Sequence, residues 1–339
     1  MVASAMPKDS NTLNVVAVGA SAGGVEALTR FVAGLPPDLP YAVLVALHLP
    51  TRAPSVLARI LDRNGPLPAA EASDGAPLEP GTIRVAVPDR HLLVYDHRVA
   101  LSQGPTENRH RPAINSLFRS VAVSIGHRAV SVLLSGVLDD GTLGSAAIRS
   151  RGGTTIAQSP RDALFPAMPR TAIEAGVVDH QVAAGDVGAL LMRLADRTFE
   201  EPKMNHDASM DLENRIAMAR RFSTDFNTED LGSPSGYTCP DCNGGLIDVS
   251  EGNYRCHVGH AWTADALLEA RDSEVDGALW VAMRSLQEKA KLSRRLAGQV
   301  DAGILRDRYQ AIADETEHAM SVLGARLSDF YTQHEESGG

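Results

Sequence analysis

Short apolar runs alternate with amphipathic segments along the first 197 residues or so of the chain. The apolar runs are rich in Val, Ile and Leu, as buried strands are, and they lie at 15–18, 41–47, 83–87 and 130–134. Between them, residues 25–35 and 114–121 place apolar side chains three and four positions apart, which is typical of amphipathic helices. The alternation predicts an α/β fold class, a doubly wound and mostly parallel sheet covered by helices.

One stretch of this region departs from the alternation. Residues 92–101 contain two apolar runs separated by Asp96 and His97, which predicts a hairpin with its turn at those two residues.

The pattern changes after residue 197. A polar stretch with at most one helix predicts a linker, and a small unit that contains all the cysteines follows it. Two long segments with apolar stripes then predict helices over 264–299 and 302–332, with a turn near 301–303. The expected divisions are a disordered tail (1–13), the α/β domain (14–197), the linker (198–235), the cysteine unit (236–262) and a helical hairpin (263–335).

Composition and charge narrow the class of protein. A net charge of -10 and the scarcity of aromatic residues argue against nucleic acid as a partner. The polar N-terminal residues lack the apolar core of a signal peptide, and no apolar run is long enough to span a bilayer, so we expect no insertion into a membrane. The three cysteines lie within eighteen positions, which indicates metal ligation in a reducing compartment, and hence a cytoplasmic protein.

Reactive side chains follow three of the predicted strands. Ser21 comes after the first strand, His48 after the second, and Asp139 and Asp140 after the strand at 130–134. In an open parallel sheet, reactive groups gather just beyond the carboxyl ends of the strands. A serine, a histidine and a carboxylate are the groups that a serine hydrolase requires as nucleophile, base and orienting acid.

The residues around Ser21 allow more than one interpretation. In GASAGG (19–24), the amides of Ala22 and Gly23 would lie at a helix N-terminus and favour an oxyanion, but serine is equally common in tight turns and helix caps. The segment fits G-x-S-x-G, a short and common pattern, and the order Ser, His, Asp differs from that of ordinary α/β-hydrolases. The glycines do not space as a dinucleotide-binding motif, and no lysine forms a Walker loop, so a nucleotide site is disfavoured.

The cysteine unit has the ligand spacing of a structural zinc site. Cys239 and Cys242 form C-x2-C, and Cys256 follows after thirteen residues with His260 four positions further on. His260 is the expected fourth ligand because His257, beside Cys256, would have difficulty facing the same metal. Four protein ligands leave no open position, so the predicted zinc-ribbon-like unit is structural.

Five motifs together resemble the catalytic domain of the chemotaxis receptor methylesterases, the CheB type, across the first 195 residues or so. They are GASAGG (19–24), LHLP (47–50), RHRPAINSLF (109–118), SGVLDDGTLG (135–144) and AQSPRDALFPAMPRTAI (157–173). The resemblance implies that Ser21 is the nucleophile, His48 the base and Asp140, in place of Asp139, the orienting acid. His110 and Arg111, within the third motif, allow two interpretations, contact with the substrate and a solvated polar turn, of which we favour the turn. The cysteine unit is similar to the C-terminal units of stand-alone relatives that lack a receiver domain, and only about thirteen residues precede the first strand here.

The resemblance implies a protein-glutamate methylesterase, a serine hydrolase of chemotaxis signal transduction that needs no cofactor for catalysis. Its substrates would be glutamyl methyl esters on chemoreceptor-like proteins, and glutamine deamidation would be a second activity. The family usually has threonine at position 22 and Gly-Met-Gly where this chain has Gly136, Val137 and Leu138. Because the backbone of that run helps to form the family's oxyanion site, we assign Ala22, Gly23 and Val137 to the oxyanion and substrate region.

A competing hypothesis is a signalling scaffold that is weakly active or inactive and binds a protein partner through its C-terminal region. The distances between Ser21, His48 and Asp140 would discriminate the two hypotheses. The helical hairpin has the form of a docking or dimerisation element, so a homo-oligomer through these helices is a further expectation, while two helices that merely pack on each other would show the same pattern.

Overall fold

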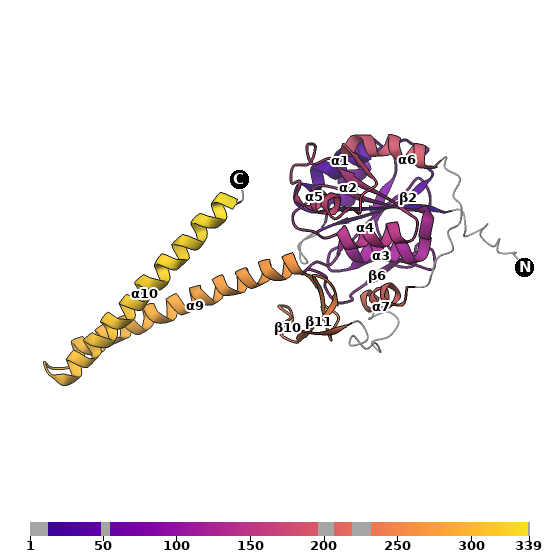
Figure 1. Cartoon of the computed structure of the whole chain (residues 1–339). Helices are drawn as coiled ribbons and strands as arrows, with labels where there is room; N and C mark the ends of the chain where they lie inside the picture. Colours follow the sequence, from indigo (N-terminus) through magenta and orange to yellow (C-terminus); the bar gives the residue numbers. More distant parts are fainter. Residues whose placement is uncertain (1–12, 49–54, 196–206, 219–231, 338–339) are drawn as a thin grey trace, which may run out of the picture. The chain divides into compact units, whose positions relative to one another are not determined.

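The computed structural model describes residues 13–48, 55–195, 207–218 and 232–337, and the chain divides into two compact units, Met1–Ala266 and Leu267–Gly339 (Figure 1). The tail expected over 1–13 lies, apart from Leu13, outside the described residues, as does most of the linker expected over 198–235.

A seven-stranded sheet forms the centre of the first unit. Every adjacent pair of its strands is parallel. The strand order is β3 (Ala69–Glu71), β4 (Ile83–Val85), β2 (Tyr41–Leu47), β1 (Asn14–Ala20), β7 (Ala129–Leu133), β8 (Thr154–Gln158) and β9 (His180–Val182). The predicted α/β fold class with a parallel sheet is confirmed.

Helices cover both faces of this sheet (Figure 1). Side chains alternate along β1, so Val16 and Val18 pack on one face while Val15 and Ala17 pack on the other. The first face carries α1 (Gly24–Ala33), α2 (Leu57–Asn64) and α6 (Val187–Ala195), and the second carries α3 (Ile114–Ile125), α4 (Thr142–Ser150) and α5 (Ala167–Glu174). The strands are apolar on both sides because both of their faces are buried.

The hairpin predicted over 92–101 is present as a separate two-stranded sheet. Strands β5 (His91–Tyr95) and β6 (Arg98–Ser102) are antiparallel, and the turn residues Asp96 and His97 both have positive φ, at 48° and 55°. Helix α7 (Ala208–Ala217), within the segment expected as linker, packs against this hairpin, and the Ser102 hydroxyl donates to the carbonyl of its last residue over 2.6 Å.

A four-stranded antiparallel sheet contains the cysteines. Its strands are β10 (Ser233–Thr238), β11 (Gly245–Ser250), β12 (Asn253–Cys256) and β13 (Ala261–Thr263), in that order. We call residues 233–263 the Cys/His ribbon. The ribbon lies in the same compact unit as the parallel sheet.

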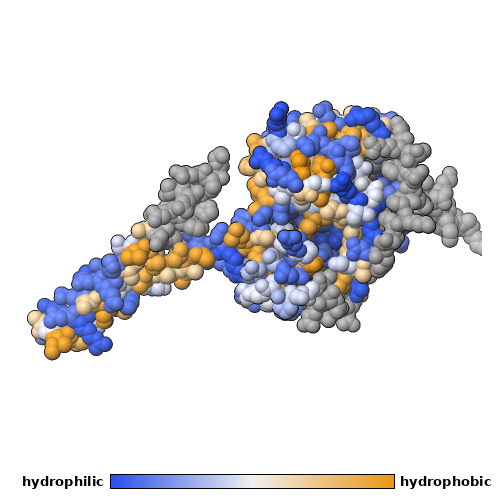
Figure 2. Space-filling model, viewed as in Figure 1, coloured by the Kyte–Doolittle hydropathy of each residue, from blue (hydrophilic) through white to orange (hydrophobic). Residues whose placement is uncertain are grey.

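The second unit is a helical hairpin. Helix α9 (Ala264–Gln299) coincides with the predicted helix over 264–299, and α10 (Ile304–Ser337) replaces the helix expected over 302–332. Arg294 on α9 pairs with Asp314 and Glu317 on α10, at 2.7 and 2.8 Å. Apolar side chains are exposed along these helices, among them Trp280, Val281 and Leu292. Figure 2 shows hydrophobic residues on the surface of both helices. Among the helices of the described ranges, none carries an apolar stretch long enough to cross a bilayer.

Candidate active site and metal centre

The three reactive side chains follow three adjacent strands of the sheet. Ser21 comes directly after β1, His48 directly after β2, and Asp140 after β7 and a short loop. The strand order places β1 between β2 and β7, and all three strands point the same way. Their carboxyl ends therefore bring the three residues to one edge of the sheet, as the strand-end argument expects.

Ser21, His48 and Asp140 form a continuous chain of hydrogen bonds. His48 Nδ1 lies 3.0 Å from Ser21 Oγ, and His48 Nε2 lies 2.7 Å from Asp140 Oδ2. A carboxylate only accepts hydrogen bonds, so Nε2 carries the imidazole proton and Nδ1 is left to accept the proton of the serine hydroxyl. The side chains of His48 and Asp140 are 7% and 3% exposed, which strengthens the interaction between them.

Asp140 is held by the N-terminus of α3 as well as by the histidine. The backbone N–H of Ile114 donates to Oδ2 over 2.8 Å, and that of Asn115 donates to Oδ1 over 3.0 Å. Burial alone would raise the pKa of Asp140, but the hydrogen bond from His48, the nearby histidines and the Ile114 amide lower it overall. Asp140 is therefore a carboxylate in a fixed orientation.

The neighbouring acid, Asp139, faces a different group. Its Oδ1 accepts a hydrogen bond from the Thr263 hydroxyl over 3.0 Å. Burial raises the pKa of Asp139 to about 6, and the charges of Asp140 and Asp265 add to this effect. Asp140, the acid that the resemblance implies in place of Asp139, is the one that contacts His48.

The turn that carries Ser21 depends on glycine. Gly23 has φ 66°, and a Cβ there would lie 2.8 Å from Ser135 Oγ and 2.9 Å from Phe165 Cδ2. Ser135 ties the turn to the loop after β7, because its carbonyl accepts from the Ser21 N–H over 2.9 Å and its hydroxyl donates to the Ala22 carbonyl over 2.8 Å. Sequence reasoning did not single out Ser135, since a buried serine has no distinguishing pattern.

The residues expected around an oxyanion lie on both sides of Ser21. Ala22 and Gly23 directly precede α1, with Gly23 as its N-cap residue. No hydrogen bond from either amide or from that of Val137 occurs within the described part of the chain. On the other side, a Cβ on Gly136 would lie 3.0 Å from Ser21 Cβ, so the loop with Val137 packs directly beside the serine. Leu138, where the family usually has glycine, has φ 59°.

His110 lies against His48, contrary to the expectation of a solvated polar turn. The two rings are stacked, with centroids 3.6 Å apart and planes 6° from parallel. Burial and the charge of His48 lower the pKa of His110 to about 4, so its ring is neutral at pH 7. Arg111 is also bound, because its guanidinium donates to Asp89 and to the Gly104 carbonyl. The stacking of His110 on His48 joins distant parts of the chain, so the local sequence has no pattern that predicts it.

The four predicted metal ligands converge in the Cys/His ribbon. Ligand atoms of Cys239, Cys242, Cys256 and His260 all lie within 4.8 Å of one another. Cys242 Sγ is 3.6 Å from Cys256 Sγ, and His260 Nδ1 is 3.5 Å from the same sulfur. Bonds of about 2.3 Å in a tetrahedron imply ligand separations of about 3.8 Å, so the donor set could hold a zinc ion.

Other groups complete the surroundings of this cluster. The Trp262 indole N–H donates to Cys239 Sγ over 3.4 Å. Hydrogen bonds from Cys256, His260 and Trp262 outweigh burial and lower the pKa of Cys239, which favours the thiolate that metal binding requires. His257 instead packs over Gly244, where a Cβ would lie 2.5 Å from its ring.

A parallel α/β sheet with a Ser–His–Asp chain at its carboxyl edge is an arrangement found in serine hydrolases. Residues 16–191 match the CheB methylesterase family, and the chain belongs to that family. Apart from the first two residues of β1, residues 16–191 contain the strands of the parallel sheet, and they contain all three members of the hydrogen-bonded chain.

Individual relatives agree with this assignment. The chain is 39% identical over 189 residues to protein-glutamate methylesterase/protein-glutamine glutaminase 4 of Anaeromyxobacter dehalogenans, covering 54% of this chain and 52% of that protein. It is 42% identical over 181 residues to protein-glutamate methylesterase/protein-glutamine glutaminase 3 of the same organism, covering 53% of this chain and 53% of that protein. The CheB methylesterase catalytic domain of Thermotoga maritima matches 54% of this chain and 98% of its own, with 30% identity and a TM-score of 0.52. The chain thus spans about half the length of the curated relatives it matches.

Proposed function

We propose that this protein is a serine esterase that hydrolyses glutamyl methyl esters on chemoreceptor-like signalling proteins and releases methanol. The observation that carries the proposal is the hydrogen-bonded chain from Ser21 through His48 to Asp140, within a domain of the CheB methylesterase family. The names of the relatives, protein-glutamate methylesterase/protein-glutamine glutaminase, support glutamyl methyl esters as substrates and glutamine deamidation as a second activity. The chemoreceptor-like substrate protein follows from the family resemblance.

The geometry supports a two-step mechanism. Ser21 Oγ attacks the γ-carbonyl carbon of the ester while His48 Nδ1 takes the hydroxyl proton, and the carboxylate of Asp140 stabilises the imidazolium that results. The amides of Ala22, Gly23 and Val137 would stabilise the negative oxygen of the tetrahedral intermediate. His48 then returns the proton to the departing methoxide, which leaves a glutamyl ester on Ser21.

The second step releases the product. Water attacks the glutamyl ester while His48 Nδ1 accepts a proton from the water. Collapse of the second tetrahedral intermediate returns the proton to Ser21 Oγ and frees the glutamate side chain. The same sequence with an amide releases ammonia from glutamine, which accounts for both parts of the relatives' names.

We propose further that the Cys/His ribbon holds a structural zinc ion. Cys239, Cys242, Cys256 and His260 would be its four ligands, which leaves no position for a substrate. The site supplies no chemistry to the esterase step, so catalysis needs no cofactor.

A cytoplasmic location and self-association through α9 and α10 stay proposals as well. The absence of a membrane-spanning helix in the described ranges and the exposed apolar side chains of the hairpin support them. Sedimentation of the full chain at several concentrations would test the second.

The test of the activity is methanol release from methylated receptor fragments, with Ser21→Ala beside the parent. We expect release by the parent and none by the variant, together with labelling of the parent alone by a fluorophosphonate. Methanol release that is equal in both proteins would refute the assignment of Ser21. Labelling of Ser21 without methanol release would leave an esterase acting on another ester and refute the receptor substrate.

A further inference from the structure

The active-site turn, residues 106–110, connects the catalytic histidine with the Cys/His ribbon. Its two central residues, Asn108 and Arg109, have φ of 50° and 65°, and Glu107 and His110 exchange backbone hydrogen bonds of 3.2 and 2.8 Å. This is a tight two-residue turn, so the position of His110 follows the position of Glu107. His110 in turn stacks on His48.

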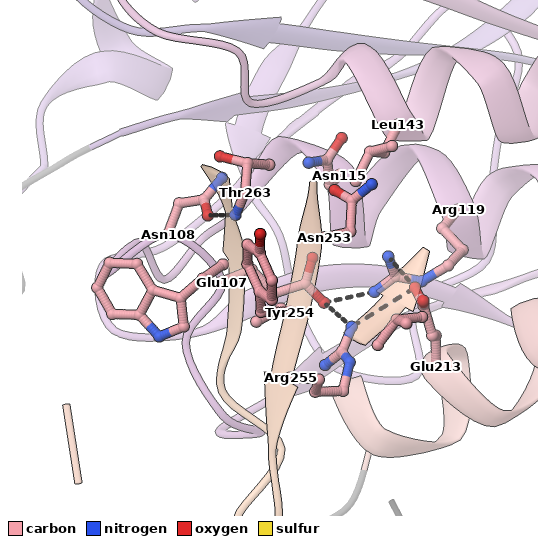
Figure 3. A pocket seen from close by; sticks show the side chains of 13 residues that line it. Glu107, Asn108, Asn115, Arg119, Leu143, Glu213, Asn253, Tyr254, Arg255 and Thr263 are labelled. Atoms are coloured by element: carbon pink, nitrogen blue, oxygen red, sulfur yellow. Dashed lines mark hydrogen bonds and ion pairs between the residues drawn. The ribbon is translucent and has the colours of Figure 1, made fainter. Parts of the chain in front are cut away.

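The ribbon holds the opposite side of this turn through its backbone. The Asn108 N–H donates to the Ala261 carbonyl over 2.8 Å, and the Ala261 N–H donates to the Thr106 carbonyl over 3.1 Å. The Thr263 N–H donates to Asn108 Oδ1 over 2.9 Å (Figure 3). Strand β13 thus pairs with the turn one residue after the predicted ligand His260.

Asp241, within the C-x2-C motif, also binds the turn. Its Oδ2 accepts a hydrogen bond from the Thr106 hydroxyl over 2.7 Å, and its Oδ1 lies 3.9 Å from Arg109 Nε. Arg109 also covers the ring of Trp262, with its guanidinium carbon 5.6 Å from the ring centroid. Residues next to Cys242 and residues just after His260 therefore both contact the turn.

A buried group of four charges completes the contact (Figure 3). Glu107 pairs with Arg119 of α3 and, at 3.4 Å, with Arg255 of β12, while Glu213 of α7 lies 2.9 Å from Arg119 and 3.5 Å from Arg255. The side chains of Glu107, Arg119 and Arg255 are 3–6% exposed. If Arg255 moved away, the buried carboxylate of Glu107 would keep Arg119 as an ion-pair partner but lose Arg255, which would destabilise the folded protein.

The contact is an interface and has no room for a ligand. A cavity of about 30 Å³ between the four charges and the ribbon strands has space for only one or two water molecules. Three ribbon residues that hold the turn or its charges, Asp241, Arg255 and Ala261, each directly adjoin a predicted ligand: Cys242, Cys256 and His260 respectively. Any rearrangement of the ligands is therefore transmitted to the turn within one residue.

We propose that the Cys/His ribbon is a positioning part of the esterase site, in which a bound zinc ion holds the active-site turn and thereby keeps His110 stacked on His48. The inference rests on the proposed function for its kinetic consequence. His110 acts through His48 and does not touch the reacting atoms, so it is a positioning residue. Loss of zinc releases the turn, the imidazole of His48 loses its stacked neighbour, and the chemical step slows while substrate binding persists.

The experiment uses the full chain before and after zinc is removed by a chelator, with zinc content measured in each state. A displacement of the reactive imidazole by about 1 Å is enough to cost up to about 100-fold in rate. We therefore expect kcat for methanol release to fall by about 10- to 100-fold with KM unchanged, and to return with stoichiometric zinc. An unchanged kcat in the zinc-free protein would overturn the proposal.

A second readout does not depend on the substrate. In protein with ¹³C-labelled histidine, the ring signal of His110, assigned through His110→Gln, is displaced by the stacked His48 ring. We expect zinc removal to shift this signal toward that of a free histidine while circular dichroism still reports a folded sheet. A His110 signal that is indifferent to zinc would refute the coupling. If no receptor fragment released methanol with the loaded parent, the proposed function would fail and the His110 signal would still decide this inference.

A matched pair of variants keeps the test sharp if zinc removal unfolds the chain. Asn108→Gly tolerates the positive φ but deletes the acceptor for the Thr263 N–H, whereas Asn108→Asp retains a carboxyl oxygen there. We expect Asn108→Gly to lower kcat and shift the His110 signal, and Asn108→Asp to restore both toward the parent. Equal behaviour of the two variants would contradict the proposal.

Discussion

Replacement of Asp140 by asparagine tests whether the orientation of His48 is what makes the site reactive. The carboxylate accepts three hydrogen bonds, one from His48 and two from the Ile114 and Asn115 amides. Asparagine has one acceptor oxygen and one donor group in the same space, so it cannot accept from both sides. In one orientation, the NH2 group of the asparagine faces the Asn115 N–H, so two donors meet. In the other orientation, the NH2 group faces the Ile114 N–H and His48 Nε2.

Both orientations harm the site, for different reasons. In the first, the tautomer of His48 is preserved but the negative charge that stabilises the imidazolium is lost. In the second, His48 Nε2 must accept, so Nδ1 carries the proton and can no longer take one from Ser21. We expect kcat to fall by about 10⁴-fold, the loss that this substitution causes in a serine protease triad, with KM within about threefold.

The same substitution alters stability by a smaller amount. One buried backbone N–H loses its acceptor in either orientation, which costs about 1–3 kcal/mol. Because the pKa of Asp140 is lowered in the folded protein, its charge stabilises the fold above its unfolded pKa, and this contribution is lost as the pH falls through the folded pKa. The difference in stability between parent and Asp140→Asn should therefore narrow in acid.

The assay is methanol release under saturating substrate, and ¹⁵N spectra of the imidazole report which nitrogen carries the proton. Asp139→Asn is the matched control, because it changes the adjacent acid and retains an acceptor for the Thr263 hydroxyl. We expect this control to keep kcat within about threefold of the parent. A kcat for Asp140→Asn within tenfold of the parent, or a larger loss in Asp139→Asn, would refute the assignment of the orienting acid.

Two further substitutions have effects that follow from geometry and charge. The pKa of Asp139 is raised to about 6, so this group binds its proton more tightly in the folded state, and its contribution to stability is present in acid and lost as the pH rises from about 4 to 6. Asp139→Asn should therefore raise the melting temperature at pH 7 by an amount equivalent to about 3 kcal/mol and leave it unchanged at pH 4. An equal increase at both pH values would contradict the burial argument. Gly23→Ala should lower the free energy of unfolding by about 1–2 kcal/mol through backbone strain alone, and by more because the new Cβ approaches Ser135 and Phe165 closely. We also expect it to slow fluorophosphonate labelling of Ser21. A normal melting temperature and labelling rate would show that the turn tolerates a side chain.

Much of the fold could be predicted from local pattern. The strand 41–47 has the observed bounds, the hairpin turn at Asp96 and His97 is where it was expected, and the helix 264–299 coincides with α9. Strands β3 and β9 could not be found in this way, because three residues are too short to show a period. They are strands because they form backbone hydrogen bonds with β4 and β8, their partners in the parallel sheet.

The assignment of the orienting acid shows where local pattern stops. Asp139 and Asp140 are neighbours of the same type, and the strand-end argument alone does not choose between them. The choice depends on which side chain faces the N-terminus of α3, because the Ile114 and Asn115 amides fix the carboxylate toward His48. The same limit explains His110, whose neutral ring and stacked position come from contacts with residues far away in the chain.

The sequence by itself determined the types and places of the reactive groups: a serine and a histidine at strand ends, two acids in the next loop, and four ligands at zinc spacing. These features depend on local periodicity and on short-range spacing, which a chain expresses without its neighbours. Only the tertiary structure decided that the amides of Ile114 and Asn115 hold Asp140, that the ring of His110 stacks on that of His48, and that the Cys/His ribbon contacts the active-site turn. Such contacts join segments up to about 150 residues apart, and they form because burial pairs each charge and donor with the partner that folding brings beside it.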